Sequence, residues 1–361
     1  MRISRAARAA VSGGRAIAWE AGDSVVAPTP PATRWFDEIR EGCGAFEWIT
    51  LAYFAWLEAI VLVCHRNIPH AGRYFAIHLL IAAAIGCLVG GAARSRSEVI
   101  RFARHWYPLP LYIFCFEELQ GLVHAIFPGW FDPWLVAFDY SIANVHPSVW
   151  LARFASPALN DFMQFAYMTY FLELVVLPAI LYARRERLAF WTVMVSTAIA
   201  NYSIYAIAIV LPVESPYYSL ARLQTKPLAG GGCTALIDLI ERFGRVHGAA
   251  FPSAHVAGSM VAVLAAWRYR RWLFWVCVPF FACMCVATVY GRYHYVADVL
   301  AGFAVGAIGL AAGSKLMGRV ARCRIAGVFV ATGAGTSEAE KPETGLRGRC
   351  RATTKSTTCC R

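Results

Sequence analysis

Long runs of apolar residues recur along the chain, separated by short polar or basic segments. A helix needs about 20 mostly apolar residues to cross a bilayer. Runs near this length lie at 46–64, 74–93, 107–127, 162–182, 188–211, 254–267, 272–290 and 295–314. The third run also holds prolines and acidic residues, and the sixth is short. This pattern predicts an all-α fold, a polytopic transmembrane helix bundle of about six to eight spans.

Arginine-rich loops indicate how many of these runs cross the membrane. Loops rich in Lys and Arg stay in the cytoplasm. The strongest lie at 94–104, 184–187 and 268–271, and a further basic segment follows the last run. All four share one side only if the third run spans, so we expect eight spans with both termini cytoplasmic. The extracytoplasmic loops are then 65–73, 128–161, 212–253 and 291–294.

The composition agrees with a multi-pass integral membrane protein. Hydrophobic residues make up 58% of the chain and charged residues 16%, whereas soluble domains are about a quarter charged. The net charge of +12 lies mainly at the ends and in short loops, so we expect a lipid bilayer and no nucleic acid as partner. We expect an N-terminal cytoplasmic segment at 1–45, disordered at its start, a transmembrane catalytic domain at 46–315 and a basic, disordered cytoplasmic tail at 316–361.

The twelve cysteines form no CxxC pair and no Cys/His zinc spacing. We therefore expect neither a metal site nor disulfide bonds.

The loop at 212–253 contains an amphipathic stretch, ALIDLIERFGR at 235–245. Leu236, Leu239, Ile240 and Phe243 recur at helical spacing, and charged residues fall on the other face. This pattern predicts an interfacial helix lying on the membrane just before the helices that carry the candidate site. A helix packed on the bundle is an equal alternative.

Two stretches carry the candidate chemistry, 248–260 (GAAFPSAHVAGSM) and 288–302 (TVYGRYHYVADVLAG). His294 and Asp298 are four residues apart and share one face of a helix. The carboxylate can fix the tautomer of the imidazole and leave its far nitrogen free to attack or to accept a proton. In the other stretch, Ser253 is placed to cap a helix whose first turn holds His255. By itself, the His294–Asp298 spacing fits equally well an interfacial histidine with a satisfied carboxylate.

Cations gather on the same predicted face. Arg292 lies two residues before His294, and the loop at 212–253 adds Arg222, Lys226, Arg242 and Arg245. Two histidines, one buried carboxylate and several cations are typical of a phosphoryl-transfer site. One histidine attacks, the other protonates the leaving oxygen, and the cations hold the phosphate oxygens. Such a site needs no metal and no cofactor.

These stretches resemble the second and third signatures of the type 2 phosphatidic acid phosphatase superfamily, which read roughly PSGH and SRxxxxxHxxxD. The matching residues are FPSAH at 251–255 and YGRYHYVAD at 290–298. Within the superfamily, the chain is most similar to the branch that includes inositol phosphorylceramide synthases. That similarity extends to the segments FDYSIANVHP and LPVESPYY and covers roughly 105–315.

The resemblance implies a role for each matching residue. His294 would be the nucleophile that forms a phosphohistidine, Asp298 would orient it, and His255 would be the general acid for the leaving alcohol. Ser253 and the neighbouring amides would bind phosphate oxygens. Arg292, Lys226, Arg222 and Arg245 would supply positive charge.

The chain also departs from the family pattern. Ala254 replaces the glycine of PSGH, Thr288 stands where an arginine is expected, and the first signature, KxxxxxxRP, is absent. We expect Arg292 to replace the missing charge at Thr288.

The resulting prediction is an integral membrane lipid phosphatase or phosphotransferase that acts on a phospholipid or lipid phosphate. The alternatives are a head-group transferase, a membrane transporter, a serine hydrolase using Ser253, and a catalytically silent relative. Other ionisable residues within the apolar runs are expected to form hydrogen bonds between helices; they are Glu58, His78, Glu117, Glu118 and Glu173. Glu117 and Glu118 could instead line a polar head-group cavity.

Overall fold

The computed structural model describes residues 44–333, and it is helical throughout these residues apart from connecting loops. No β-strand occurs between 44 and 333, where Val213 and Ala249 form a single isolated bridge. The predicted segments at 1–43 and 334–361 lie outside the described residues. The helices are α2 (Ala45–Val63), α3 (Ala71–Arg94), α4 (Glu98–Trp106), α5 (Pro108–Glu117), η1 (Glu118–Gly121), α6 (Asp132–Ala143), α7 (Pro147–Leu151), η2 (Ala152–Phe154), α8 (Pro157–Ala183), α9 (Arg187–Val210), α10 (Pro216–Ser219), η3 (Ala221–Leu223), α11 (Gly232–Gly244), α12 (Ala254–Tyr269), α13 (Arg271–Tyr290) and α14 (Val296–Gly333).

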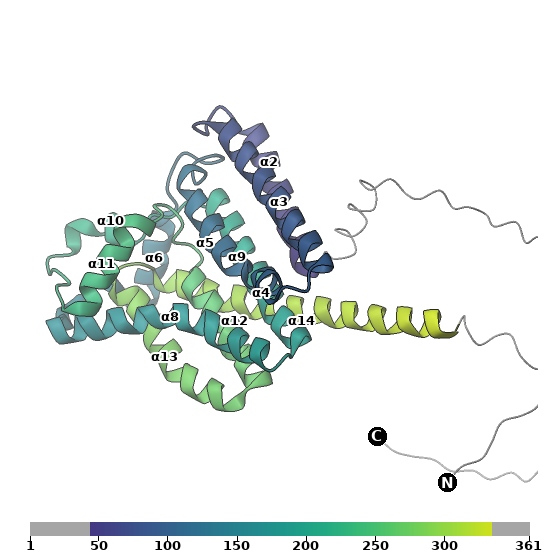
Figure 1. The fold of residues 1–361 in the computed structure, drawn as a ribbon. Helices are drawn as coiled ribbons and strands as arrows, with labels where there is room; N and C mark the ends of the chain where they lie inside the picture. The colour runs from purple at the N-terminus through teal and green to yellow at the C-terminus, as the bar shows by residue number, and fades with distance from the viewer. Residues whose placement is uncertain (1–43, 334–361) are drawn as a thin grey trace, which may run out of the picture.

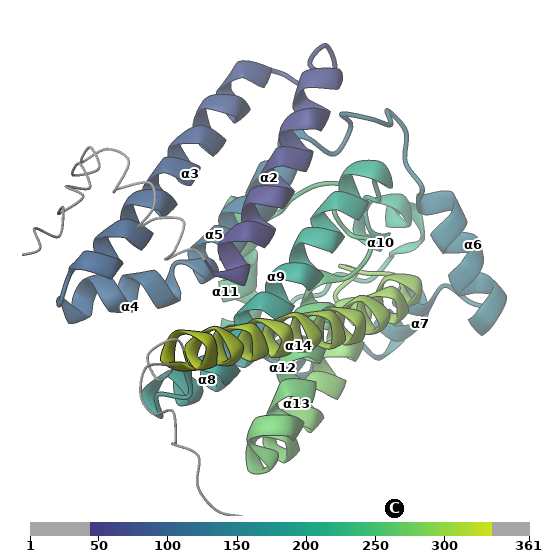
Figure 2. The same ribbon diagram turned by 90° about the vertical axis from the view of Figure 1, so that its right-hand side faces the viewer.

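The predicted all-α bundle is confirmed. Six of the described helices are long and apolar enough to cross a membrane: α2, α3, α8, α9, α13 and α14. In Figures 1 and 2, α2 and α3 form an antiparallel pair beside a main bundle that contains α8, α9, α12, α13 and α14. Helix α14 packs on both α9 and α12, and α8 packs on α13.

Two of the eight predicted runs do not form helices of spanning length. In the run 107–127, α5 ends at Glu117 and a 3-10 turn follows, so the expected continuous span is wrong there. In the run 254–267, α12 has 16 residues and lies in the interior, with ten of them buried. A helix of that length is about 24 Å long, and its neighbours in the bundle shield it.

The segment around α5 nevertheless connects the two ends of the bundle. At its start, Tyr107 donates a hydrogen bond to Glu47 near the beginning of α2. After its end, Gln120 accepts a hydrogen bond from the backbone of His247 at 2.9 Å, in the loop that leads to α12. The chain therefore passes from one end to the other through a short helix and a turn.

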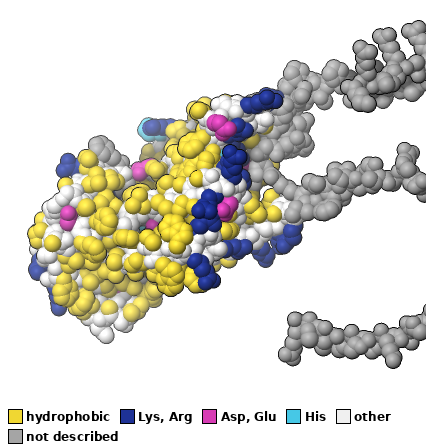
Figure 3. All heavy atoms as spheres, turned by 60° about the horizontal axis from the view of Figure 1, so that its bottom comes forward, with side chains coloured by type: hydrophobic (Ala, Val, Ile, Leu, Met, Phe, Trp, Pro, Cys, Tyr) yellow, Lys and Arg dark blue, Asp and Glu magenta, His cyan; other side chains and the backbone are white. Residues whose placement is uncertain are grey.

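The predicted basic loops meet at one end of the molecule. Arg270 forms an ion pair with Glu186, which joins the loop at 268–271 to the loop at 184–187. Arg104, at the end of α4, lies 4.9 Å above the ring of Trp191 near the start of α9. Figure 3 shows a mostly hydrophobic face with Lys and Arg side chains toward its two ends, more of them near the grey tails.

Glycines on α14 allow close approach to two neighbouring helices. A Cβ on Gly302 would lie 2.8 Å from the carbonyl oxygen of Ser253, and one on Gly306 would lie 2.6 Å from that of Ala257, both on the α12 side. Gly309 and Gly313 meet α9 in the same way. Small residues at such crossings are typical of helices packed within a membrane.

A buried histidine ties α3 to the bundle. His78 is bonded through Nδ1 to Glu58 of α2 and through Nε2 to Glu118 of η1, the latter at 2.7 Å. Only His78, Val89 and Gly90 of α3 are buried. The prediction that these ionisable residues form bonds between elements is confirmed for His78, Glu58 and Glu118.

Candidate functional site

Two helix starts bring the candidate catalytic residues together. Ser253 is the N-cap of α12, as expected, and its hydroxyl accepts a hydrogen bond from the backbone of Val256 at 3.3 Å. The backbone of Ser253 donates to the carbonyl of Asp298 at 3.1 Å, which joins the start of α12 to the first turn of α14. The residues that follow Ser253 and precede Asp298 therefore face each other.

His294 lies in the short turn between α13 and α14. Its backbone donates to the carbonyl of Thr288 at 3.1 Å. Its ring Nδ1 lies 2.8 Å from the carbonyl oxygen of Ala250 and 3.2 Å from Oδ2 of Asp298. Since both neighbours are acceptors, Nδ1 carries a proton and donates, so Nε2 is the nitrogen with the free lone pair in the neutral ring.

Asp298 is fully buried directly behind His294. Its Oδ2 also accepts a hydrogen bond from the backbone of Tyr295 at 2.8 Å. This second bond fixes the carboxylate relative to the turn that carries the histidine. A buried carboxylate needs such partners, because an unpaired charge is expensive away from water.

His255 faces His294 from the first turn of α12, with their ring centroids 5.8 Å apart. Two tyrosine rings of α8 lie against the imidazole, Tyr167 and Tyr170, each with its centroid 4.6 Å away. Its Nδ1 is buried and has no hydrogen-bond partner in the described structure. The ring is thus held by packing, and its nitrogens are free to exchange a proton with a bound molecule.

The two histidines line one cavity of about 510 Å³. Arg245, Glu241, Glu214 and Glu117 line its polar part, and the remainder is mostly aromatic and aliphatic. Leu109, Ile113 and Phe116 of α5 form one wall, and Phe171, Leu174 and Val175 of α8 form another. Ile113 and Val175 are also 60% and 40% exposed, so the cavity reaches the outer, apolar surface between α5 and α8.

The five residues predicted to bind substrate occupy different places. Arg245 lines the cavity, where it is ion-paired with Glu241 and lies 4.3 Å above the ring of Tyr217. Ser253 is buried at its cap position. Neither Ser253 nor the other three line the cavity. Arg292 donates to the carbonyl of Lys226 at 2.5 Å, Lys226 donates to the carbonyl of Arg153 at 3.0 Å, and Arg222 is exposed on η3.

Sequence reasoning did not single out two buried carboxylates of α6, Asp132 and Asp139. Asp139 accepts from the backbone of Val296 at 2.8 Å and of Ala297 at 3.0 Å. Asp132 accepts from the hydroxyl of Tyr295 at 2.7 Å. Asp139 lies in the segment FDYSIANVHP, but no sequence pattern links residues that lie more than 150 positions apart.

Glu117 and Glu118 have separate roles despite being adjacent. Glu117 lines the cavity, whereas Glu118 bonds to His78.

No group of three or more His, Cys, Asp or Glu residues in the described part of the chain is arranged to hold a metal ion.

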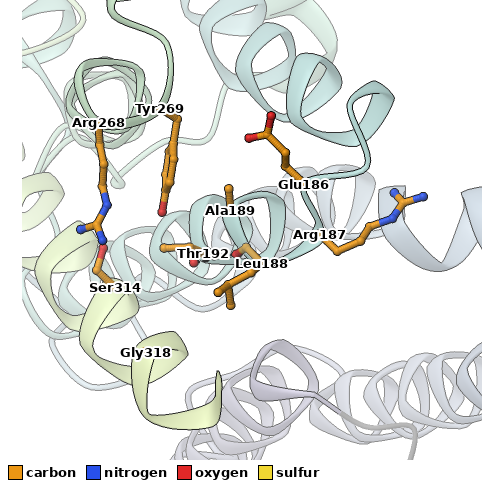
Figure 4. A pocket seen from close by; sticks show the side chains of 9 residues that line it. All are labelled: Glu186, Arg187, Leu188, Ala189, Thr192, Arg268, Tyr269, Ser314 and Gly318. Atoms are coloured by element: carbon orange, nitrogen blue, oxygen red, sulfur yellow. Dashed lines mark hydrogen bonds between the residues drawn. The ribbon is translucent and has the colours of Figure 1, made fainter. Parts of the chain in front are cut away.

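A second pocket, of about 430 Å³, lies at the opposite end of the bundle (Figure 4). It is formed around the 184–187 loop, the end of α12 and the middle of α14, and Glu186, Arg187, Arg268 and Tyr269 are among its lining residues. It contains none of the predicted site residues, so it is separate from the histidine cavity.

Comparison with known proteins identifies the segment that carries this site. A search of curated proteins and a search of solved structures each returned no match. The family model described as the PAP2 superfamily matches residues 133–312, which include His255, His294 and Asp298. The segment from 133 to 312 is therefore similar to the PAP2 superfamily.

Proposed function

We propose that the protein is a membrane phosphotransferase or phosphatase that acts on a lipid phosphate ester through a phosphohistidine at His294. The observation that carries the proposal is the His294–Asp298 pair facing His255 across one cavity. A nucleophile whose other nitrogen is held by a carboxylate, opposite a second titratable group, is the arrangement that covalent catalysis requires.

The proposed reaction has two steps. In the first, Nε2 of His294 attacks phosphorus, the bond from phosphorus to the leaving oxygen breaks, and His255 donates a proton to that oxygen. In the second, a hydroxyl group attacks the phosphohistidine, His255 takes its proton, and the bond from phosphorus to Nε2 breaks. Asp298 stabilises the positive charge on the imidazole in both steps. No metal ion enters this scheme.

The shape of the cavity favours a lipid as substrate. A polar end with the two histidines continues into an apolar arm that reaches the outer surface between α5 and α8. A phosphate head group suits the polar end, and a hydrocarbon chain suits the arm.

The same cavity favours transfer to a lipid alcohol over hydrolysis. His294 is only 5% exposed and the walls are largely apolar. Exclusion of water protects a reactive intermediate from hydrolysis. We therefore propose a head-group transferase of the kind that inositol phosphorylceramide synthases represent, with the phosphatase reaction as the alternative. The end with the basic loops is assigned to the cytoplasm and the histidine end to the extracytoplasmic face.

The test is a panel of labelled lipid phosphates and phosphodiesters, incubated with the purified protein in vesicles with and without a lipid alcohol. Transfer to the alcohol should exceed release of phosphate. His294→Ala should abolish both reactions, and His255→Ala should slow them by about 10²–10⁴-fold. His65→Ala, at an exposed histidine, is the matched control. Unchanged turnover in His294→Ala would overturn the proposal.

A further inference from the structure

Helix α6 presents two acidic side chains on one buried face. Asp132 and Asp139 are seven residues apart, which is two helical turns, and each is 3% exposed. Elsewhere on its surface the helix exposes large apolar residues such as Trp134, Tyr140 and Ile142. The carboxylates therefore point inward, where a charged group is stable only with hydrogen-bond partners.

Asp139 holds the beginning of α14. Its Oδ2 accepts from the backbone of Val296 at 2.8 Å, and its Oδ1 accepts from the backbone of Ala297 at 3.0 Å. These are among the first N–H groups of the helix, which have no partner within the helix itself. Asp139, which lies more than 150 residues earlier in the chain, therefore caps the N-terminus of α14.

Asp132 holds two other segments together. Its Oδ2 accepts from the backbone of Glu214 at 2.8 Å, and its Oδ1 accepts from the backbone of Ser215 at 3.2 Å and from the hydroxyl of Tyr295 at 2.7 Å. Ser215 has a φ of 114°, which a residue other than glycine adopts only when its surroundings enforce it. Glu214 and Ser215 also line the cavity.

Three of these five contacts converge on the residues that directly follow His294. Tyr295, Val296 and Ala297 are each bonded to α6, and the backbone of Tyr295 also donates to Asp298. The relative position of His294 and Asp298 depends on this first turn. We propose that Asp139 and Asp132 are positioning residues, which fix the turn that carries the nucleophile and its carboxylate partner.

This inference rests on the proposed function, since it assigns the residues that position the proposed nucleophile. Asp139→Ala would leave two N–H groups without an acceptor and would loosen the first turn of α14. A displacement on the order of 1 Å at a reacting group costs about 10²-fold in rate. We expect kcat to fall by about 10–100-fold while KM changes less than about threefold, because the cavity that binds the substrate is intact.

Three further variants make the test specific. Asp139→Asn keeps the shape but has one carbonyl oxygen for two N–H groups, so we expect an intermediate loss of kcat. Tyr295→Phe removes only one hydroxyl, which is bonded to Asp132 and to Ser219, and we expect a loss of a few-fold in kcat at unchanged KM. Asp238→Ala, at an exposed position of α11, is the control and should match the unsubstituted protein.

Two readouts separate the inference from a failure of the proposed function. The first is kcat and KM at matched amounts of folded protein, together with the rate of phosphohistidine formation. The second is hydrogen–deuterium exchange of the amides at 295–298, which needs no turnover. Faster exchange in Asp139→Ala, confined to this turn and absent in Asp238→Ala, supports the inference even if no lipid tested is a substrate.

Exchange at 295–298 that is unchanged in Asp139→Ala would overturn the inference, as would an unchanged kcat. If Asp139→Ala does not fold, Asp139→Asn and Tyr295→Phe decide by the same measurements. A loss of activity that only follows the folded fraction would show a general structural role and would also overturn it.

Discussion

Replacement of Gly306 by alanine tests whether the two halves of the site depend on the spacing of α12 and α14. His255 is carried by α12, and Asp298 by α14, with His294 just before it. Gly306 is buried in α14, two turns beyond Asp298, where the helix crosses α12. The substitution adds one methyl group and changes no charge.

The structure gives the size of the perturbation. The new Cβ would lie 2.6 Å from the carbonyl oxygen of Ala257 and 2.8 Å from Cβ of Met260. Ordinary contacts of carbon are about 3.5–4.0 Å, so the helices must separate by on the order of 1 Å. Such overpacking costs about 1–3 kcal/mol. Because the shift moves His255 away from His294 and Asp298, we expect kcat to fall by about 10²-fold.

Gly318→Ala is the matched control on the same helix. Nothing lies within 4 Å of a Cβ at this position. Alanine is a better helix former than glycine by about 1 kcal/mol, so this variant should be as stable as the unsubstituted protein or more stable, with unchanged kcat. Thermal unfolding in detergent and turnover in vesicles provide the two measurements. Equal stability and equal kcat for the two variants would refute the reasoning.

Two other predictions concern the buried His78 and the opening of the cavity between α5 and α8. His78→Ala leaves the carboxylates of Glu58 and Glu118 without their partner, and the loss of a buried ion pair costs about 3–5 kcal/mol; thermal unfolding in detergent should show it, and an unchanged melting temperature would contradict it. Val175→Trp narrows the opening between α5 and α8 and should raise KM about 10-fold for a long-chain lipid, but not for a short-chain soluble analogue. Leu172→Trp, on the same helix but outside the cavity, should change neither value, and equal effects of the two substitutions would argue against the opening.

The main features of the fold follow from local patterns in the sequence. Long apolar runs predict the six spanning helices, and the basic loops predict which ends of these helices lie together. The amphipathic spacing near 235–245 predicts a helix, which the structure has as α11. The third run was less predictable because it contains prolines and acidic residues and its helix ends at Glu117. The next residue, Glu118, is bonded to His78, so tertiary contacts determine the path of the chain there.

The site was predictable only where its residues are close in sequence. The spacing of His294 and Asp298 is a helical turn, and Ser253 is a recognisable cap. The positions of the basic residues depend on how the 212–253 loop folds, and only Arg245 among the predicted arginines and lysines lines the cavity. Asp132 and Asp139 could not be identified from spacing, since their partners come from distant segments.

The wall of the cavity is shared between two stretches of the chain. The histidines and α8 belong to the segment matched by the superfamily, whereas α5 precedes it. A change in Leu109, Ile113 or Phe116 can therefore alter which lipids are accepted without touching a reacting group. On the proposed function, chemistry and lipid selectivity can evolve separately, and exchange of the region before residue 133 between relatives is the direct way to engineer a new preference.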